Sequence, residues 1–247
     1  MTRGQAWKTP ELANKYLSGV RGAIPLANEQ IEVMMRLIKA TGINVGSFLD
    51  LGSGDGILSA AILDNFPDAK AVLLDFSEPM IEAAKNKLRA YNNIDFIVYD
   101  YGDSSWIKKV AYSFPFDIVV SGFSIHHQTD SRKYELYKEI FDLLSADGLF
   151  INIEHVLSPT KWIGSIFAEY FIDSLYRLQL KQGGKMSLQE VAGEFYNRPD
   201  KEANILAPVE KQCEWLRRIG YKDVDCYFKI FELAVFGGRR VNGDNGV

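Results

Sequence analysis

The sequence is poor in cysteine and contains no long apolar run. Its 247 residues include two cysteines, Cys213 and Cys226, which are too few for a disulfide framework and form no CxxC pair. A reducing compartment is therefore expected, and the cytoplasm fits best. A membrane-spanning helix needs about 18 consecutive apolar residues, and no stretch of the sequence comes close to that length. The opening residues MTRGQAWKTPELANKY also lack the apolar core of a secretion signal. We therefore expect neither a membrane segment nor export.

Positive charge is also scarce. Lysine and arginine number 28 against 32 acidic residues, which gives a formal net charge of −4. Contact with nucleic-acid phosphates requires clustered basic side chains, whereas pairs such as Lys108-Lys109 and Arg217-Arg218 are typical of solvated faces. The composition therefore disfavours a nucleic-acid partner. The hydrophobic content of 47% is that of a globular chain, and we expect one domain over residues 1–247.

Apolar runs alternate with amphipathic helices through the middle of the chain. The expected strands are SFLDLG (47–52), KAVLLD (70–75), IDFIVYD (94–100), FDIVVSG (116–122) and GLFINIEH (148–155). Such alternation is typical of βαβ units in a mostly parallel sheet. A doubly wound, Rossmann-like α/β sheet of this kind binds its ligands at the carboxyl ends of the strands.

Other segments flank this core, which we assign to residues 45–155. Residues 1–40 are expected to contribute N-terminal helices, and residues 156–205 a helical insertion rich in Phe, Tyr and Trp. Residues 206–240 then supply a last helix and two strands within VDCYFKIFELAVFGG. The connection between these two strands is so short that they must be antiparallel.

The segment LDLGSGDG places three glycines, Gly52, Gly54 and Gly56, behind Asp50 and between a strand and a helix. Glycine lets a ligand approach the backbone without meeting a Cβ atom, and the helix N-terminus behind it offers free N–H groups. The spacing departs from the G-x-G-x-x-G fingerprint of dinucleotide sites. Acids at Asp50 and Asp55 are also poor neighbours for a pyrophosphate, but they suit a cationic ammonium or sulfonium.

Acidic residues also end the next two expected strands. Asp75 follows Gly52 by 23 residues, where a carboxylate can accept hydrogen bonds from ribose hydroxyls. Asp100 is followed by Tyr101, so a carboxylate and an aromatic ring are available for an adenine. Strand-end acids also occur in structural turns, but three of them on successive strands indicate a nucleoside site.

The ordered segments LDLGSGDG, LLDFSEPMIEAAK, YDYGD, PFDIVVSGFSIHH and LLSADGLFINIEH resemble the motifs of the class I S-adenosylmethionine-dependent methyltransferases. The resemblance covers residues 45–155 and, less strongly, the terminal strand pair. It implies a seven-stranded sheet whose last strand is antiparallel, with S-adenosylmethionine over the glycine loop. The cofactor-binding residues that it implies are Asp50, Gly52, Ser53, Gly54, Gly56, Asp75, Phe76, Met80, Asp100, Tyr101, Ser121, Gly122 and Phe123.

Within that set, the resemblance assigns a part of the cofactor to each region. Asp50 and Gly52 would lie near the methionine part, and Asp75 would hold the ribose. Asp100 and Tyr101 would bind the adenine, with Phe76 and Met80 packed around it. The backbone of residues 121–123 would approach the reacting end.

The methyl acceptor is narrowed mainly by motifs that the sequence lacks. No N/D-P-P-Y/F follows the fourth strand, where the sequence is SGFSIHH, and no Pro-Cys occurs there. Methylation of a nucleic-acid base is therefore disfavoured. Asp130 and Glu154 do not show a spacing that indicates a divalent cation, so no metal is expected. The expected methyl acceptor is therefore a small molecule that is methylated on an O, N or C atom.

All three histidines lie at the expected ligand-binding edge, and they are the candidate catalytic residues together with one acid: His126, His127, Glu154 and His155. An imidazole with a pKa of about 6.5 can remove a proton from an oxygen or nitrogen atom of the methyl acceptor. Because positioning alone can supply much of the rate of a methyl transfer, a structural role for these histidines is the alternative.

The N-terminal segment YLSGVRGAIP offers Tyr16 and Arg21 as substrate-binding residues on a flap, with Arg21 suited to pair with a carboxylate. An exposed arginine beside a packing tyrosine is the alternative. The segment is also similar to the start of the carboxy-S-adenosylmethionine synthases, so modification of the cofactor itself stays open. A non-catalytic protein that binds an S-adenosyl ligand, a dehydrogenase, and a homodimer formed through the helical insertion are further alternatives.

Overall fold

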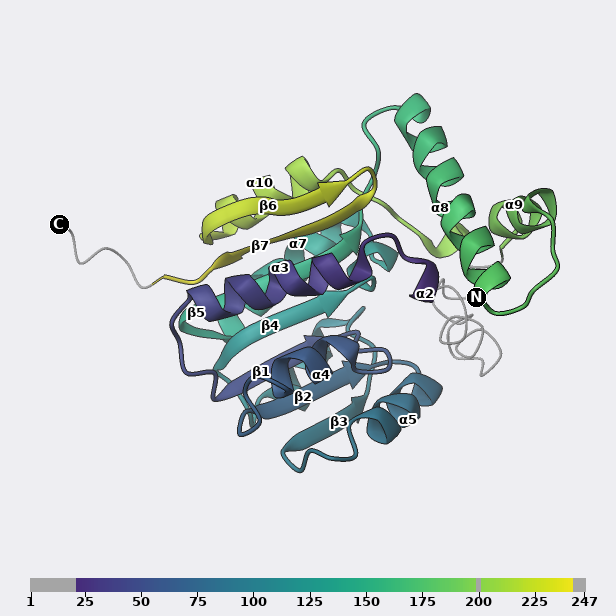
Figure 1. Ribbon diagram of the computed structural model, residues 1–247. Coiled ribbons are helices and arrows are strands. Elements are labelled where there is room, and N and C mark those ends of the chain that lie inside the picture. Colours follow the sequence, from purple (N-terminus) through teal and green to yellow (C-terminus); the bar gives the residue numbers. More distant parts are fainter. Residues whose placement is uncertain (1–20, 199–200, 242–247) are drawn as a thin grey trace.

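The computed structural model describes residues 21–198 and 201–241, and its centre is a seven-stranded sheet (Figure 1). The strands lie in the order β3-β2-β1-β4-β5-β7-β6. Strands β1 to β5 pair in parallel, whereas β7 lies between β5 and β6 and is antiparallel to both. The strand bounds are β1 Ser47–Leu51, β2 Lys70–Asp75, β3 Ile94–Val98, β4 Phe116–Gly122, β5 Leu144–His155, β6 Lys222–Ile230 and β7 Leu233–Arg239. The predicted fold class is confirmed.

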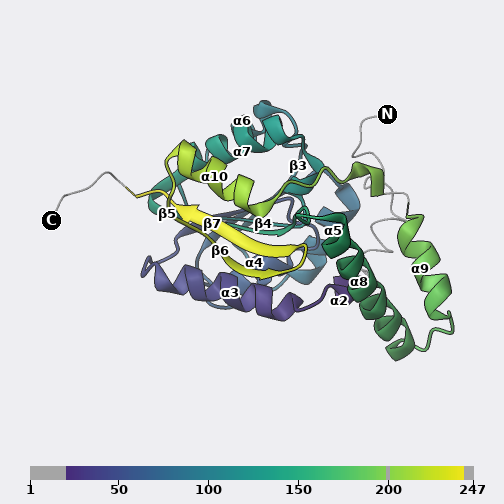
Figure 2. The same ribbon diagram turned by 90° about the horizontal axis from the view of Figure 1, so that it is seen from above.

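Helices cover both faces of the sheet (Figures 1 and 2). On one face, α3 (Ala27–Ala40), α4 (Ile57–Leu63) and α5 (Glu78–Lys87) bury an apolar cluster against the strands. On the other, α6 (Ile107–Val110), α7 (Asp130–Leu143) and α10 (Val209–Ile219) bury a second one. Strands β1, β2 and β4 read as nearly continuous apolar runs because both of their faces are covered.

Two element bounds differ from the sequence prediction, and the first of them concerns a predicted site residue. Strand β3 ends at Val98, so Asp100 lies two residues beyond the strand and not at its end. Strand β5 begins at Leu144, four residues earlier than expected, and passes through Asp147 at a φ of 66°.

The segment between β5 and α10 forms α8 (Lys161–Lys181) and α9 (Leu188–Tyr196). Both views show these helices beyond the carboxyl ends of the strands, beside the short α2 (Arg21–Ala23) (Figures 1 and 2). Hydroxyl side chains cap both helices, with Thr160 accepting from Ile163 N and Ser187 from Glu190 N. Among the described residues, no helix is both long and apolar enough to cross a bilayer.

Candidate active site

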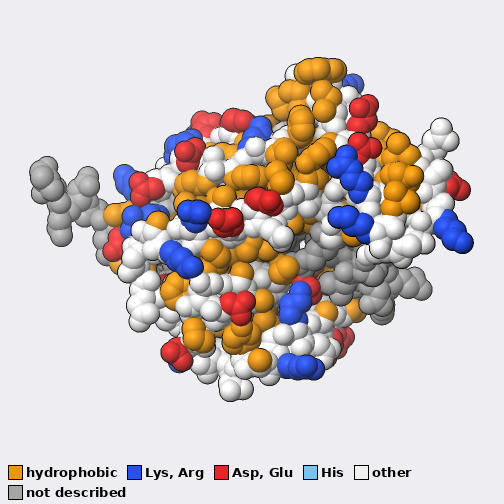
Figure 3. Space-filling model, in the orientation of Figure 1, with side chains coloured by type: hydrophobic (Ala, Val, Ile, Leu, Met, Phe, Trp, Pro, Cys, Tyr) orange, Lys and Arg blue, Asp and Glu red, His pale blue; other side chains and the backbone are white. Residues whose placement is uncertain are grey.

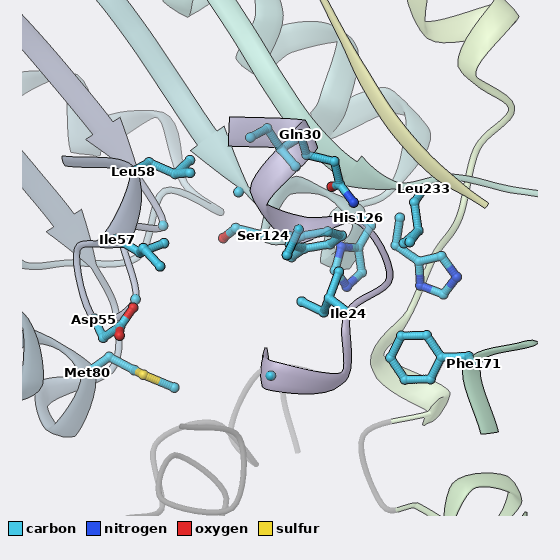
Figure 4. Close-up of a pocket in the computed structure, with 18 of the residues that line it drawn as sticks. Ile24, Gln30, Asp55, Ile57, Leu58, Met80, Ser124, His126, Phe171 and Leu233 are labelled. Carbon is cyan, nitrogen blue, oxygen red and sulfur yellow. The ribbon is translucent and has the colours of Figure 1, made fainter. Parts of the chain in front are cut away.

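A cavity of about 1150 Å³ opens at the carboxyl ends of the parallel strands, between the sheet and helices α2, α8 and α9. We call the part formed by the glycine loop 52–56 and residues 75–80 the cofactor side. The part formed by the three histidines and helices α8 and α9 is the acceptor side. In Figure 4, Asp55 and Met80 lie at one end, Phe171 lies at the other, and His126 lies between them.

Two of the three glycines in the glycine loop, Gly52 and Gly54, are glycine for different reasons. Gly52 has a φ of +69°, and a Cβ atom there would lie 1.9 Å from the Ser124 Oγ atom. Gly54 has a φ of +54°, but a Cβ atom there would meet nothing within 4 Å. Gly52 is therefore required by the neighbouring turn after β4, whereas Gly54 faces open space in the cavity.

Asp75 ties this loop to the next strand. Its two carboxylate oxygens accept hydrogen bonds from Gly54 N and Ser77 N, each at 2.8 Å. Burial raises the pKa of Asp75 to about 6, against the effect of these backbone donors. The carboxylate is therefore held beside the loop in a poorly solvated position, where additional donors would favour its ionised form.

The cofactor side fits an S-adenosyl ligand. Ser53 Oγ is buried at the cavity wall and makes no hydrogen bond within the described part of the chain. The Asp75 carboxylate suits ribose hydroxyls, and Gly54 leaves room for a ligand against the backbone. Asp50 also lines the cavity, where an acid suits a cationic ligand, and Asp55 forms an ion pair there with Lys87.

Most of the predicted cofactor residues line the cavity: Asp50, Gly52, Ser53, Gly54, Asp75, Phe76, Met80, Gly122 and Phe123. Gly56, Asp100, Tyr101 and Ser121 do not. Gly56 is the N-cap of α4, and Ser121 Oγ donates to Leu51 O at 2.7 Å. Tyr101 is buried, and its hydroxyl lies 2.6 Å from Ser124 Oγ. Asp100 is exposed and accepts a hydrogen bond from Gly102 N. Binding of adenine by Asp100 and Tyr101 stays a prediction.

His126 and Glu154 form a buried pair on the acceptor side. His126 lies in the 3₁₀ turn η4 (Ile125–His127), and its Nδ1 atom is 2.5 Å from Glu154 Oε1. Glu154 also accepts hydrogen bonds from the backbone N–H groups of His126 and His155. The His126 ring lines the cavity, but Glu154 is 1% exposed and lies behind the ring, away from the cavity wall.

Burial moves the pKa values of this pair in opposite directions. It raises the pKa of Glu154 to about 7, although backbone donation and nearby cationic groups oppose the change. It lowers the pKa of the His126 imidazole well below its usual value. Since both shifts disfavour the charged forms, the imidazole is neutral at neutral pH. A neutral imidazole whose Nδ1–H is held by a carboxylate has Nε2 available as a proton acceptor.

The other two histidines are held by different partners. His155 Nε2 lies 2.8 Å from Glu232 Oε2, at the tip of the β6–β7 hairpin. His127 Nδ1 lies 3.2 Å from Ala203 O. The ring of His126 lies 4.0 Å from that of His127 and 5.8 Å from that of His155, measured between centroids. The structure thus brings the three histidines together around one part of the cavity.

Sequence reasoning missed the segment that returns from α9 to α10. We call residues 203–207 the strap, and it lies directly on the histidine turn. Ile205 N donates to His126 O at 2.8 Å, and Leu157 N donates to Ala207 O at 3.0 Å. Asn204 of the strap lines the cavity. Its Oδ1 atom is buried, and the Asn204 side chain also interacts with the His126 ring through a hydrogen bond. Nothing in NILAP at this point marks it as part of a site.

Two predicted substrate-binding residues cannot be placed. Tyr16 lies outside the described residues, and of Arg21 only the backbone, at the start of α2, is described. The next residue along, Gly22, lines the cavity. The described ranges contain no group of three His, Cys, Asp or Glu side chains that could hold a metal ion.

Comparisons with known proteins agree with this geometry. A family model described as a methyltransferase domain matches residues 49–150. The carboxy-S-adenosyl-L-methionine synthase of Nautilia profundicola is 24% identical over 236 residues, which are 92% of this chain and 91% of that protein. Two solved structures share the fold at a TM-score of 0.58. An O-methyltransferase family protein from Burkholderia thailandensis is 14% identical, with 88% of this chain and 59% of that chain covered. PigF with SAH is 17% identical, with 94% and 60% covered.

The matched family region contains the glycine loop, Asp75 and the histidine turn, and the shared fold extends over most of the described chain. The resemblance stated from the motifs is confirmed, and so is the cofactor that it implies. Together these matches support a class I S-adenosylmethionine-dependent methyltransferase.

Proposed function

We propose that this enzyme methylates an oxygen or nitrogen atom of a small molecule bound on the acceptor side, with His126 as the general base. The observation that carries the proposal is the His126–Glu154 pair, in which a buried carboxylate holds Nδ1 of a ring that lines the cavity. Glu154 then acts by orienting His126, and not by contact with the acceptor.

S-adenosylmethionine, when bound, supplies a methyl group on a positively charged sulfur. The chain's own residues have two tasks beside it. The Glu154 carboxylate accepts the Nδ1–H of His126, so that Nε2 can take the proton that an acceptor O–H or N–H gives up. The cavity walls hold the acceptor in line with the methyl group, and such positioning contributes much of the rate.

The walls of the acceptor side favour a small molecule with an apolar part. Helix α8 contributes Phe167, Phe171 and Leu175 to the cavity, and α9 contributes Val191 and Phe195. These side chains suit an aromatic or aliphatic body. A formal net charge of −4 speaks against a nucleic-acid acceptor.

The proposal also includes a cellular location and an oligomeric state. Both cysteines are free, which supports a place in the reducing cytoplasm. Hydrophobic side chains gather over the beginning of α8 (Figure 3), where Trp162 is 72% exposed. This surface supports a homodimer formed through α8.

One observation favours a second function, formation of a carboxylated cofactor. The similarity to a carboxy-S-adenosyl-L-methionine synthase runs over 92% of the chain, well beyond the methyltransferase core. A ligand of that name has an additional carboxylate, which needs a cation. Arg198 lines the acceptor side, and its guanidinium lies 4.3 Å from the centre of the Phe195 ring. Glu194 lines the same wall and opposes this positive charge.

The experiment that separates these functions has two parts. Labelled S-adenosylmethionine is incubated with panels of phenols, amines and carboxylic acids, and transfer of the label is measured for the unmodified protein and for His126→Gln. Binding of S-adenosylmethionine and of its carboxylated form is compared by calorimetry, for the unmodified protein and for Arg198→Met.

Methylation of a panel member that is lost in His126→Gln supports the proposal. A preference for the carboxylated cofactor of at least about tenfold, about 1.4 kcal/mol, that disappears in Arg198→Met would favour the second function. Binding of S-adenosylmethionine without transfer to any acceptor, and without that preference, would instead identify a non-catalytic binding protein.

A further inference from the structure

A lysine is buried directly behind the acceptor side. Lys133 lies in the second turn of α7 and is 1% exposed. Lysine is almost never fully buried unless its ammonium group is paired. Burial lowers the pKa of Lys133, and the nearby acids Asp130 and Glu154 oppose that change. The position therefore holds an ammonium group at an energetic cost, and its partners indicate why.

The first partner of Lys133 is the strap. Its Nζ atom donates to Ile205 O and lies 3.4 Å from Asp130 Oδ1. The N–H of the same Ile205 donates to His126 O. Ile205 is thus held from both sides, by the lysine through its carbonyl and by the histidine turn through its N–H. Asn204, which lines the cavity, is the neighbour of this doubly held residue.

Lys133 also interacts electrostatically with the His126–Glu154 pair. The titratable and charged groups that act on this pair come from the surrounding elements and are Tyr101, Lys133, Tyr137, His127, His155 and Arg198. Lys133 is the ammonium group among them, and it acts on both members. It favours the carboxylate form of Glu154 and disfavours the imidazolium form of His126.

We propose that Lys133 is a positioning residue of the acceptor side, which holds the strap over His126 and keeps the pair as a neutral Nδ1–H imidazole bonded to a carboxylate. The proposal rests on the proposed role of His126 as the base. Without the ammonium group, Glu154 takes up a proton, because a buried carboxylate without a cation is strongly disfavoured. A protonated Glu154 donates to Nδ1, so the ring proton moves to Nε2. His126 then has no lone pair facing the cavity.

The test measures the histidine tautomer and needs no acceptor. Long-range ¹H–¹⁵N spectra of the imidazole rings are recorded at pH 7.5 for the full chain and for Lys133→Met, with His126 assigned from its loss in His126→Gln. Lys133→Arg keeps the charge. Lys138→Met removes an exposed lysine from the same helix, where Lys138 pairs with Asp142 at the surface.

The unmodified protein, Lys133→Arg and Lys138→Met are expected to show His126 with its proton on Nδ1. Lys133→Met is expected to show the proton on Nε2. Hydrogen exchange at the Ile205 amide should also become at least about tenfold faster in Lys133→Met, because Ile205 loses one of the two hydrogen bonds that hold it.

The proposal is overturned if His126 keeps the Nδ1–H form in Lys133→Met, or if the unmodified protein already has the proton on Nε2. Should Lys133→Met not fold, Lys133→Gln takes its place under the same criteria. Failure of both to fold, while Lys133→Arg folds, would mean that the lysine serves stability alone, which also overturns the proposal. Since no methyl acceptor is used, absence of methyl transfer would not affect this result.

Discussion

The cofactor side and the acceptor side of the cavity are built in different ways. The cofactor side consists of two short continuous segments, residues 52–56 and 75–80, at the ends of the adjacent strands β1 and β2. Its defining hydrogen bonds join Asp75 to backbone N–H groups. The acceptor side joins side chains that are far apart in sequence, since His126 meets Glu154, 28 residues later, and His155 meets Glu232, 77 residues later.

This difference indicates how each side can change. Backbone N–H donors do not depend on the identity of the side chain. The cofactor side should therefore tolerate amino-acid substitutions outside the glycine loop. Side-chain pairs between distant elements depend on the helices and turns that carry them. A new acceptor can therefore be accommodated through α8, α9 and the strap without change to the cofactor side. Mutations should separate the two sides, and the following predictions run from the largest expected effect to the smallest.

The largest effect is expected at His126. His126→Gln should lower turnover by about 10²–10⁴-fold, because a general base contributes a factor of that size. Affinity for S-adenosylhomocysteine should stay within a factor of a few, because His126 interacts with Glu154 and the strap and not with the glycine loop. Steady-state kinetics and calorimetry measure the two quantities.

His155→Ala provides the matched comparison for this experiment. Its Nε2 atom is held by Glu232, so a smaller loss of turnover than in His126→Gln is expected. If turnover and cofactor affinity fell together in His126→Gln, the separation between the two sides would be wrong.

The same contrast explains what could be predicted from the sequence. The sheet, the glycine loop and Asp75 follow from local patterns, because a strand, a turn and a helix that are contiguous in sequence build them. The histidines could be placed at the ligand edge, since His126 and His127 follow β4 and His155 ends β5. The pairing of His126 with Glu154, and the contacts of Lys133 and Asn204, could not be predicted, because they depend on how the return from α9 packs against β4 and α7.

Tyr101 shows the opposite error. The sequence places it beside Asp100 at an expected strand end and therefore at the adenine. Strand β3 ends two residues before Asp100, and the chain then turns so that the Tyr101 ring packs beneath the glycine loop. The position of a tyrosine near the end of a strand does not by itself specify on which side of the glycine loop the tyrosine ring will lie.

The second prediction compares two glycines within the cofactor side. Gly52→Ala should destabilise the fold by about 2–4 kcal/mol, from overpacking against Ser124 together with strain at a positive φ. Gly54→Ala has the strain without the clash, so it should cost about 1–2 kcal/mol. Chemical denaturation of both variants measures the difference.

A rescue experiment identifies the clash. The double variant Gly52→Ala with Ser124→Gly removes the Oγ and Cβ atoms that a Cβ at position 52 would meet. It should recover most of the difference between the two single glycine variants. An equal cost for Gly52→Ala and Gly54→Ala would show that Ser124 does not determine the shape of the loop.

The third prediction concerns Asp75 and its pKa of about 6. Asp75→Asn should weaken S-adenosylhomocysteine binding by about 1.5–3 kcal/mol, the contribution of a hydrogen bond to a charged group. Donors from a ribose favour the ionised carboxylate, so binding below about pH 6 must displace a proton from Asp75. Affinity should therefore decrease as the pH falls below about 6, by up to about tenfold per unit.

Calorimetry between pH 5 and 8 tests this dependence. Asp75→Asn should lose it, because the amide does not titrate, while keeping the shape of the side chain. The same decrease in Asp75→Asn would assign the titration to another group. A decrease toward high pH in the unmodified protein would mean that the ligand prefers the protonated carboxyl, with the sign opposite to that expected for ribose donors.

The smallest effect is expected at Tyr101, and it locates the boundary of the cofactor side. The Tyr101 hydroxyl lies 2.6 Å from Ser124 Oγ in a buried position away from the cavity wall. Tyr101→Phe removes this hydrogen bond and should lower the free energy of unfolding by about 1 kcal/mol. Because the ring itself is kept, S-adenosylhomocysteine affinity should not change. Asp100→Ala, measured alongside, tests the predicted adenine contact directly, since Asp100 is exposed and its loss should leave stability nearly unaltered. A loss of affinity in Tyr101→Phe larger than its loss of stability would place the hydroxyl in contact with the ligand and extend the cofactor side beneath the glycine loop.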